Sequence, residues 1–224
     1  MKKLGTFLFR YRSYTPLPFL AVLLFFAQPT VASMLVGLML VAGGEALRLW
    51  ANGYTGSETR TTSGVGASQL VVRGPYAHVR NPLYIGNMII YVGTGIMANA
   101  LLPWLPLAAV LFFGFQYSLI IRREEEFLAE AFGETYMDYC RQVWRWIPRF
   151  RPYAQSAGEQ PNFSWQRAWQ TERRTLQAIV VVVMVLAVMM LVGKREASTE
   201  VMRHRFLATG AVFRNCCVFT ENRF

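Results

Sequence analysis

Five apolar runs constrain this chain more than any other feature of its sequence. They cover residues 17–27, 31–50, 83–97, 101–121 and 176–192. An α-helix of about 20 apolar residues crosses a bilayer, and its backbone polar groups are satisfied internally. With 54% hydrophobic residues and a mean hydropathy of +0.26, the chain lies outside the ordinary soluble class. The sequence therefore predicts an all-α, polytopic integral membrane helical bundle with about five transmembrane helices.

Basic residues next to these runs predict their orientation. Some precede the first run and others lie between the second and third runs: Lys2, Lys3, Arg10, Arg12, Arg60, Arg73 and Arg80. By the positive-inside rule both stretches are cytoplasmic, so runs one and two form a hairpin turning at residues 28–29. Runs three and four form a second hairpin turning at residues 98–100. We expect a protein of the bacterial inner (cytoplasmic) membrane. Charges around the fifth run nearly balance, so the side taken by the basic, featureless tail stays open.

The charge and the cysteines exclude other classes. The net charge of +10 comes from residues that flank apolar runs, which favours membrane lipids over nucleic acid as the partner. The three cysteines are Cys140, Cys216 and Cys217, and the only histidines are His78 and His204. This spacing indicates neither a disulfide framework nor a metal site.

Residues 73–86, which read Arg-Gly-Pro-Tyr-Ala-His-Val-Arg-Asn-Pro-Leu-Tyr-Ile-Gly, form the most informative polar stretch. Pro75 and Pro82 bracket it, and the third apolar run follows directly. We call this stretch the elbow. It predicts a conformationally fixed polar site at the cytoplasmic membrane surface.

A second informative stretch, residues 122–148, leaves the fourth run. It begins Arg-Arg-Glu-Glu-Glu, continues as an amphipathic helix with a bend expected at Gly133, and ends in a basic aromatic segment before Pro148. Both stretches lie at the cytoplasmic mouths of the same hairpin, so topology brings them together. Their arginines, glutamates and aromatic rings predict one polar, charged ligand and one lipid-like ligand. A basic amphipathic piece, residues 163–174, leads into the fifth run.

Missing motifs narrow the reaction class. The chain has no Gly-x-Ser-x-Gly elbow, no Walker loop and no His-Glu-x-x-His. Transfer from a reactive cofactor needs only alignment and electrostatic stabilisation, and sulfonium methyl transfer fits because tyrosine faces and carboxylates hold cations. A Gly-x-Gly-x-x-Ala match at residues 93–98 lies inside an apolar helix, which favours close helix packing over dinucleotide binding. Glu45 and Arg48, one turn apart, are either a site or a mutually paired couple.

The two stretches together carry a family resemblance. Gly-Pro-Tyr-x-x-Val-Arg-Asn-Pro-x-Tyr-x-Gly at residues 74–86 is followed at residues 124–148 by Glu-Glu, Phe-Gly-x-x-Tyr-x-x-Tyr and Val-x-Arg-x-Ile-Pro. This pattern resembles the isoprenylcysteine carboxyl methyltransferase family, which is related to the membrane phospholipid methyltransferases. The resemblance covers about residues 45–150.

The resemblance implies an enzyme that binds S-adenosylmethionine in a cytoplasm-facing pocket and takes a lipid-like or prenylcysteine-type carboxylate acceptor from the bilayer. It implies three residues that act on the reacting groups: Glu125, Tyr139 and Arg145. It also implies nine cofactor-binding residues: Tyr76, Arg80, Asn81, Pro82, Tyr84, Gly86, Glu124, Glu125 and Tyr136. The corresponding parts of the chain are an N-terminal hairpin (1–51), a catalytic core (52–150) and a C-terminal helix with its tail (151–224).

One residue departs from the family pattern. Asn81 stands where better-known members have histidine, and an asparagine forms hydrogen bonds but does not titrate. Its expected role is cofactor positioning, with a possible change of substrate. A carboxylate acceptor is ionised at neutral pH and needs only a cation to steer it, for which Arg145 is the candidate.

Two other functions remain open. An NADPH-dependent membrane sterol-type reductase shares part of the elbow pattern, although such an enzyme should carry further spans and cofactor-binding residues. The second alternative is a non-catalytic membrane partner protein, a function that gives no reason for the polar elbow.

Overall fold

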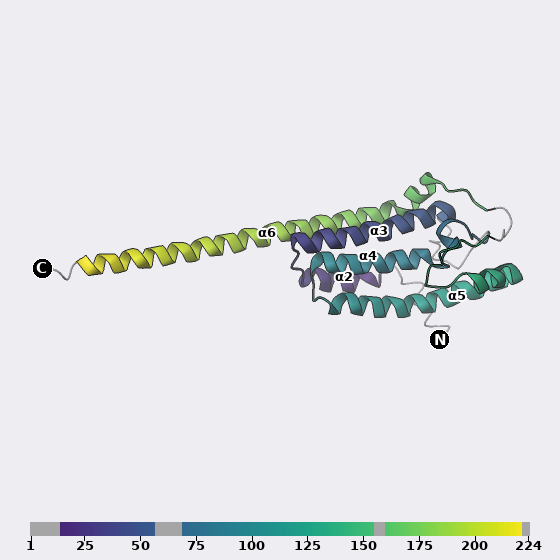
Figure 1. The fold of residues 1–224 in the computed structure, drawn as a ribbon, viewed down its shortest axis with the longest axis horizontal. Helices are drawn as coiled ribbons and strands as arrows, with labels where there is room; N and C mark the ends of the chain where they lie inside the picture. The colour runs from purple at the N-terminus through teal and green to yellow at the C-terminus, as the bar shows by residue number, and fades with distance from the viewer. Residues whose placement is uncertain (1–13, 57–68, 155–159, 221–224) are drawn as a thin grey trace.

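The computed structural model describes residues 14–56, 69–154 and 160–220, with side chains described up to residue 193, and all regular secondary structure in these residues is helical. Its elements are α2 (Pro16–Phe25), α3 (Val31–Thr55), the 3-10 helix η2 (Gly74–Ala77), α4 (Pro82–Ala98), α5 (Trp104–Gln142) and α6 (Trp165–Thr220) (Figure 1). The all-helical fold class is confirmed. The basic residues before Tyr14, together with Arg60 and the side chains of His204, Cys216 and Cys217, lie outside the described residues.

Five apolar helices lie where the apolar runs predict them. Three are long and apolar enough to cross a membrane, namely α3, α5 and the Trp165–Gly193 part of α6. The other two, α2 and α4, are shorter. The architecture is that of an integral membrane protein, and α2 is short, as its sequence predicts.

Both hairpin turns lie at the same end of the bundle. Gln28 between α2 and α3 donates its backbone N–H to the Ala98 carbonyl at 2.9 Å. Asn99, in the left-handed conformation with φ of 50°, donates its side-chain amide to the Gln28 carbonyl at 3.1 Å. Because the turns lie together, the elbow and the end of α5 lie at the opposite end (Figure 1). The second turn is longer than predicted, since α5 begins at Trp104.

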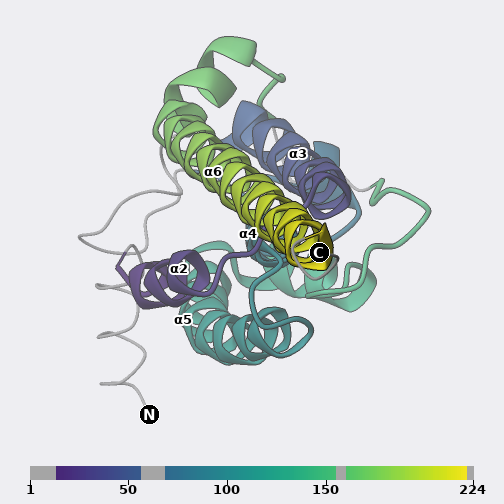
Figure 2. The same ribbon diagram turned by 90° about the vertical axis from the view of Figure 1, so that its left-hand side faces the viewer.

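The centre of the bundle is the α3–α4 pair. Helix α4 also packs against α5 and α2, and α6 lies against α3, as Figure 2 shows. Close approach depends on small residues: a Cβ on Gly93 would lie 2.9 Å from the Gly37 carbonyl oxygen. The packing interpretation of residues 93–98 is therefore confirmed, and these residues form the end of a helix.

Two helices differ in length from the expectation. α5 continues from the bilayer run to Gln142, and its only non-helical residue is Gly133 (φ 53°, ψ −130°), which confirms the predicted bend. α6 joins most of the predicted amphipathic piece, from Trp165 onward, and the fifth run into one helix, and it continues to Thr220 through the stretch expected to be a featureless tail. The sequence has no proline after Pro161, so no helix-breaking proline interrupts α6.

Candidate functional site

The elbow is fixed by its own backbone geometry. Gly74 has φ of +61°, and any side chain there would overlap the ring of Tyr54. Pro82 occupies the first turn of α4, where a missing N–H costs nothing. Asn81 precedes it without a side-chain cap, and its Nδ2 donates instead to the Arg145 carbonyl at 3.2 Å. Asn81 thus holds one stretch against the other.

Backbone hydrogen bonds join the elbow to the segment that follows α5. The Arg80 N–H donates to the Trp144 carbonyl at 3.0 Å, and the Arg149 N–H donates to the His78 carbonyl at 2.9 Å. The Tyr153 N–H donates to the Ala77 carbonyl at 2.9 Å. The two stretches therefore meet, as the topology predicts.

Glu125 is the charged centre of the contact between the elbow and residues 122–148, a contact that we call the junction. Arg145 binds its carboxylate through Nε at 3.1 Å and also through Nη2, while Arg80 Nη1 lies 3.3 Å from its Oε1. Burial alone would lower the pKa of Arg80, but Glu125 and Cys140 beside it raise that pKa above its ordinary value. Two permanently charged guanidinium groups therefore share one carboxylate.

Glu124 binds a different side chain from those that bind Glu125. Tyr84, on the first turn of α4, donates its hydroxyl to Glu124 Oε1 at 2.8 Å. The Tyr84 ring also packs on Tyr117 of α5, with ring centroids 4.7 Å apart. Both glutamates thus bind residues of the elbow, Glu124 through Tyr84 and Glu125 through Arg80.

Three tyrosines predicted to belong to the site are buried in or against the elbow. Tyr76, Tyr136 and Tyr139 are each at most 9% exposed. The Tyr139 hydroxyl donates to the Tyr76 carbonyl at 2.7 Å, and the Tyr76 hydroxyl lies 3.4 Å from the Thr55 hydroxyl. Burial raises the pKa of Tyr76 well above its usual range, so this phenol stays protonated. Tyr139, expected to act on the reacting groups, is engaged with the backbone.

Gly86, the last residue of the elbow, lies at the crossing of α3 and α4. A Cβ on it would lie 2.6 Å from Arg48 Cγ and 2.9 Å from the Gly44 carbonyl oxygen. Its neighbours are thus two residues of α3. Pro82 is also buried.

With this geometry established, comparison with known proteins shows what this part of the chain is similar to. Residues 32–135 match the phospholipid methyltransferase family. This segment includes α3 from its second residue, the elbow, α4 and the part of α5 that carries both glutamates. The resemblance to membrane methyltransferases is confirmed, and residues 32–135 are called the family-matched region below.

The curated relatives include a methyltransferase and two proteins named for metal resistance. The protein-S-isoprenylcysteine O-methyltransferase of Dictyostelium discoideum is 33% identical over 84 residues, which are 35% of this chain and 32% of that protein. The cobalt-zinc-cadmium resistance protein CzcN of Cupriavidus metallidurans is 34% identical over 118 residues, 53% of this chain and 50% of that protein. The nickel-cobalt-cadmium resistance protein NccN of Alcaligenes xylosoxydans xylosoxydans is 34% identical over 122 residues, 54% of this chain and 52% of that protein. The chain thus spans about half the length of these two bacterial relatives. No solved structure matches it.

A buried polar cluster next to this junction includes a residue that the sequence did not single out. Arg48 lies 3.5 Å from Glu45, so the two are paired as one interpretation predicted. Arg48 also donates to both carboxylate oxygens of Glu172 on α6, at 2.7 Å each. Glu172 is the only acid in residues 163–174, and an acid so close to an apolar run was the signal for it.

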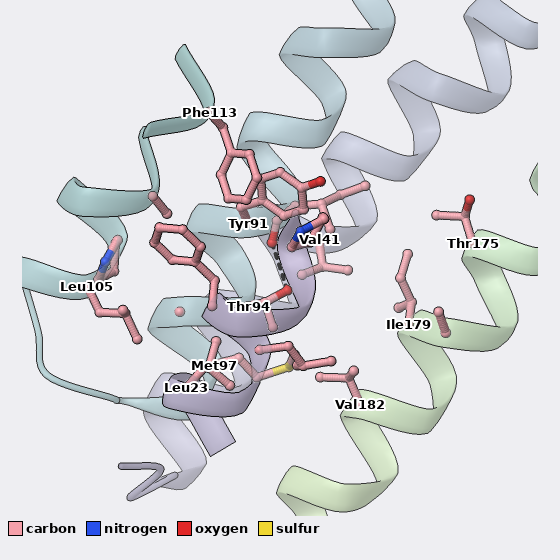
Figure 3. A pocket seen from close by; sticks show the side chains of 18 residues that line it. Leu23, Val41, Tyr91, Thr94, Met97, Leu105, Phe113, Thr175, Ile179 and Val182 are labelled. Carbon is pink, nitrogen blue, oxygen red and sulfur yellow. Dashed lines mark hydrogen bonds between the residues drawn. The ribbon is translucent and has the colours of Figure 1, made fainter. Parts of the chain in front are cut away.

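An apolar cavity of about 200 Å³ lies between the helices close to this cluster. Its walls include Leu23, Met97, Phe113 and Ile179, from α2, α4, α5 and α6 respectively (Figure 3). Few polar atoms face it. The sequence predicted a lipid-like ligand, but only the packing of the helices places a cavity here.

Proposed function

We propose that this chain is an integral membrane methyltransferase that moves a methyl group from S-adenosylmethionine to a lipid-like acceptor at the cytoplasmic membrane face. The observation that carries the proposal is the junction at Glu125, where Arg80 of the elbow and Arg145 of the second stretch meet on one carboxylate. The match of residues 32–135 to the phospholipid methyltransferase family supports it.

The residues at this junction fit the polar groups of S-adenosylmethionine. Its carboxylate needs cationic donors, and Arg80 Nε is buried with no hydrogen-bond partner among the described residues. Its ammonium group and ribose hydroxyls need acceptors, which the carboxylates of Glu124 and Glu125 supply. Its sulfonium is a cation suited to an aromatic face such as Tyr84. When bound, the cofactor supplies an electrophilic methyl group.

The protein contributes alignment and exclusion of water. Holding donor and acceptor in reacting geometry replaces a bimolecular encounter, so no protein nucleophile is required. The elbow and the end of α5 hold the polar donor at the membrane surface, while the apolar cavity suits the hydrocarbon part of an acceptor. Arg145 remains our candidate for steering a carboxylate acceptor, and it would do so while bound to Glu125.

Calorimetry on the purified chain in detergent tests this proposal. We expect S-adenosylmethionine and its demethylated product, S-adenosylhomocysteine, to bind, and NADPH not to bind. Binding of NADPH alone would favour the sterol-type reductase instead. Binding of none of the three would contradict both enzyme functions and leave the non-catalytic partner protein.

The bacterial relatives named for metal resistance suggest a cellular setting but not a metal site. The described residues contain no group of three or more His, Cys, Asp and Glu side chains that could hold a metal ion. We therefore do not extend the proposal to metal binding.

Removing the hydroxyl of Tyr84 is expected to weaken cofactor binding moderately. Tyr84→Phe keeps the ring contact with Tyr117 but deletes the 2.8 Å hydrogen bond to Glu124. Hydrogen bonds to charged groups contribute about 1.5–3 kcal/mol, so we expect S-adenosylhomocysteine affinity to fall by about tenfold in calorimetry. Tyr14→Phe, at a tyrosine that is 65% exposed, is the control and should bind as wild type. Equal affinities for the two variants would show that Glu124 does not depend on Tyr84.

A further inference from the structure

The contact between α6 and the family-matched region, residues 32–135, is an ion pair inside the bundle. The Glu172 side chain is fully buried and that of Arg48 is 10% exposed. Asn52 of α3 also donates to Glu172. A buried pair is tolerated when its geometry is good and its remaining polar atoms are hydrogen-bonded, and breaking one is strongly destabilising. Glu172 is thus held firmly by two residues of α3.

Arg48 also contacts α4, so it connects Glu172 of α6 to that helix. Its Nη1 donates to Asn87 Oδ1, and its stem leaves no room for a side chain at Gly86. Asn87 lies one turn after Tyr84, whose hydroxyl binds Glu124. A continuous set of contacts therefore runs from α6 through Arg48 to the first two turns of α4, and from there to the junction.

The same cluster lies one helical turn from the apolar cavity along both α6 and α4. Thr175 follows Glu172 by one helical turn and lines the cavity from α6, and Tyr91 follows Asn87 by one turn and lines it from α4 (Figure 3). An acceptor whose hydrocarbon part occupies the cavity would therefore lie within about one helical turn of this cluster. The orientation of Arg48 therefore matters at the place where the two ligands approach.

We propose that Glu172 is a positioning residue of the methyltransferase site, acting through Arg48 on the first two turns of α4. This inference rests on the proposed function. Glu172 holds the guanidinium of Arg48 in the orientation that binds Asn87 and packs on Gly86, and so fixes Tyr84 relative to Glu124. Glu172 lies outside residues 32–135, so α6 is a working part of the site and not merely a membrane anchor.

A purely structural role predicts a different result from a positioning role. If Glu172 only fastened α6, its loss would lower the thermal unfolding midpoint, and any other loss of α6 packing would act in the same way. Leu186 provides that comparison, since it is fully buried on α6 and packs with Leu23, Val41 and Met97.

Calorimetry with S-adenosylhomocysteine on the full chain in detergent, together with thermal unfolding, separates the two roles. Glu172→Gln is expected to bind about tenfold more weakly. Leu186→Ala is expected to bind as wild type despite a lower unfolding midpoint. If Glu172→Gln does not fold, Glu172→Asp keeps the charge but shortens the reach to Arg48, and it too should bind more weakly.

Three outcomes would overturn the inference. Wild-type affinity in a folded Glu172 variant would show that Arg48 needs no such partner. Equal loss of affinity in Leu186→Ala would show that α6 acts only through stability. A wild-type chain that binds no S-adenosylhomocysteine would overturn the proposed function and this inference with it, whereas the first two outcomes leave the proposed function intact.

Discussion

Replacing Glu125 with alanine is expected to weaken binding of S-adenosylmethionine by about 100-fold, because the change removes charge-assisted hydrogen bonds worth about 1.5–3 kcal/mol each. Glu125 is the residue on which Arg80 and Arg145 meet, and its side chain is only 15% exposed. Without it, two guanidinium groups would face each other with no carboxylate between them. Their repulsion would displace both side chains at the position where we propose that the donor binds.

Glu126→Ala is the matched control for this experiment. Glu126 is the next residue of the same helix, carries the same charge and is exposed. It should bind S-adenosylmethionine as wild type in calorimetry. Glu125→Gln keeps the shape of the side chain and should bind almost as weakly as Glu125→Ala while remaining folded by circular dichroism. Affinity unchanged by both Glu125 substitutions would show that the donor binds elsewhere.

Adding one methyl group at Gly93 is expected to destabilise the fold by about 2–3 kcal/mol, because overpacking of a close contact forces a backbone shift. A Cβ at Gly93 would lie 2.9 Å from each of three atoms of α3, the Gly37 carbonyl oxygen, Leu40 Cβ and the Val41 nitrogen. Two of these atoms belong to the backbone of a continuous helix and move only with it. Gly93→Ala should therefore lower the unfolding midpoint in detergent and, by displacing α4, weaken cofactor binding.

Gly43→Ala tests whether the effect comes from packing. Gly43 lies in α3, and a Cβ there would meet nothing within 4 Å. Alanine favours a helix over glycine by about 0.8–1 kcal/mol, so Gly43→Ala should leave stability unchanged or raise it. If Gly93→Ala were as stable as Gly43→Ala, the close α3–α4 crossing would be wrong.

Several elements follow from local sequence alone. The apolar runs predict the five helices, Pro82 predicts the start of α4, and Gly133 predicts the bend in α5. These features depend on residue type and spacing within one segment, which the sequence states directly. The boundary at Trp104 and the length of α6 were less accessible, because helix ends depend on neighbouring turns and on the absence of breakers.

The candidate site was predictable in part for the same reason. The hairpin topology brings residues 73–86 and 122–148 to one end of the bundle, and backbone hydrogen bonds between them bear this out. Sequence did not predict which arginine pairs with which glutamate, nor that the Tyr139 hydroxyl bonds to the Tyr76 carbonyl. Those pairings depend on side-chain direction, which is set by the angle between helices.

Residue order alone is enough to predict a helical membrane protein with a polar elbow at one end of a hairpin and a pattern on it that resembles membrane methyltransferases. The packing of the helices was needed to show that Glu172, more than eighty residues beyond the elbow, binds Arg48, and that an apolar cavity lies about one helical turn from this pair. Burial of a charge is tolerated only beside its partner. Which residue becomes that partner depends on how α6 packs against α3, and spacing along the chain does not specify that packing.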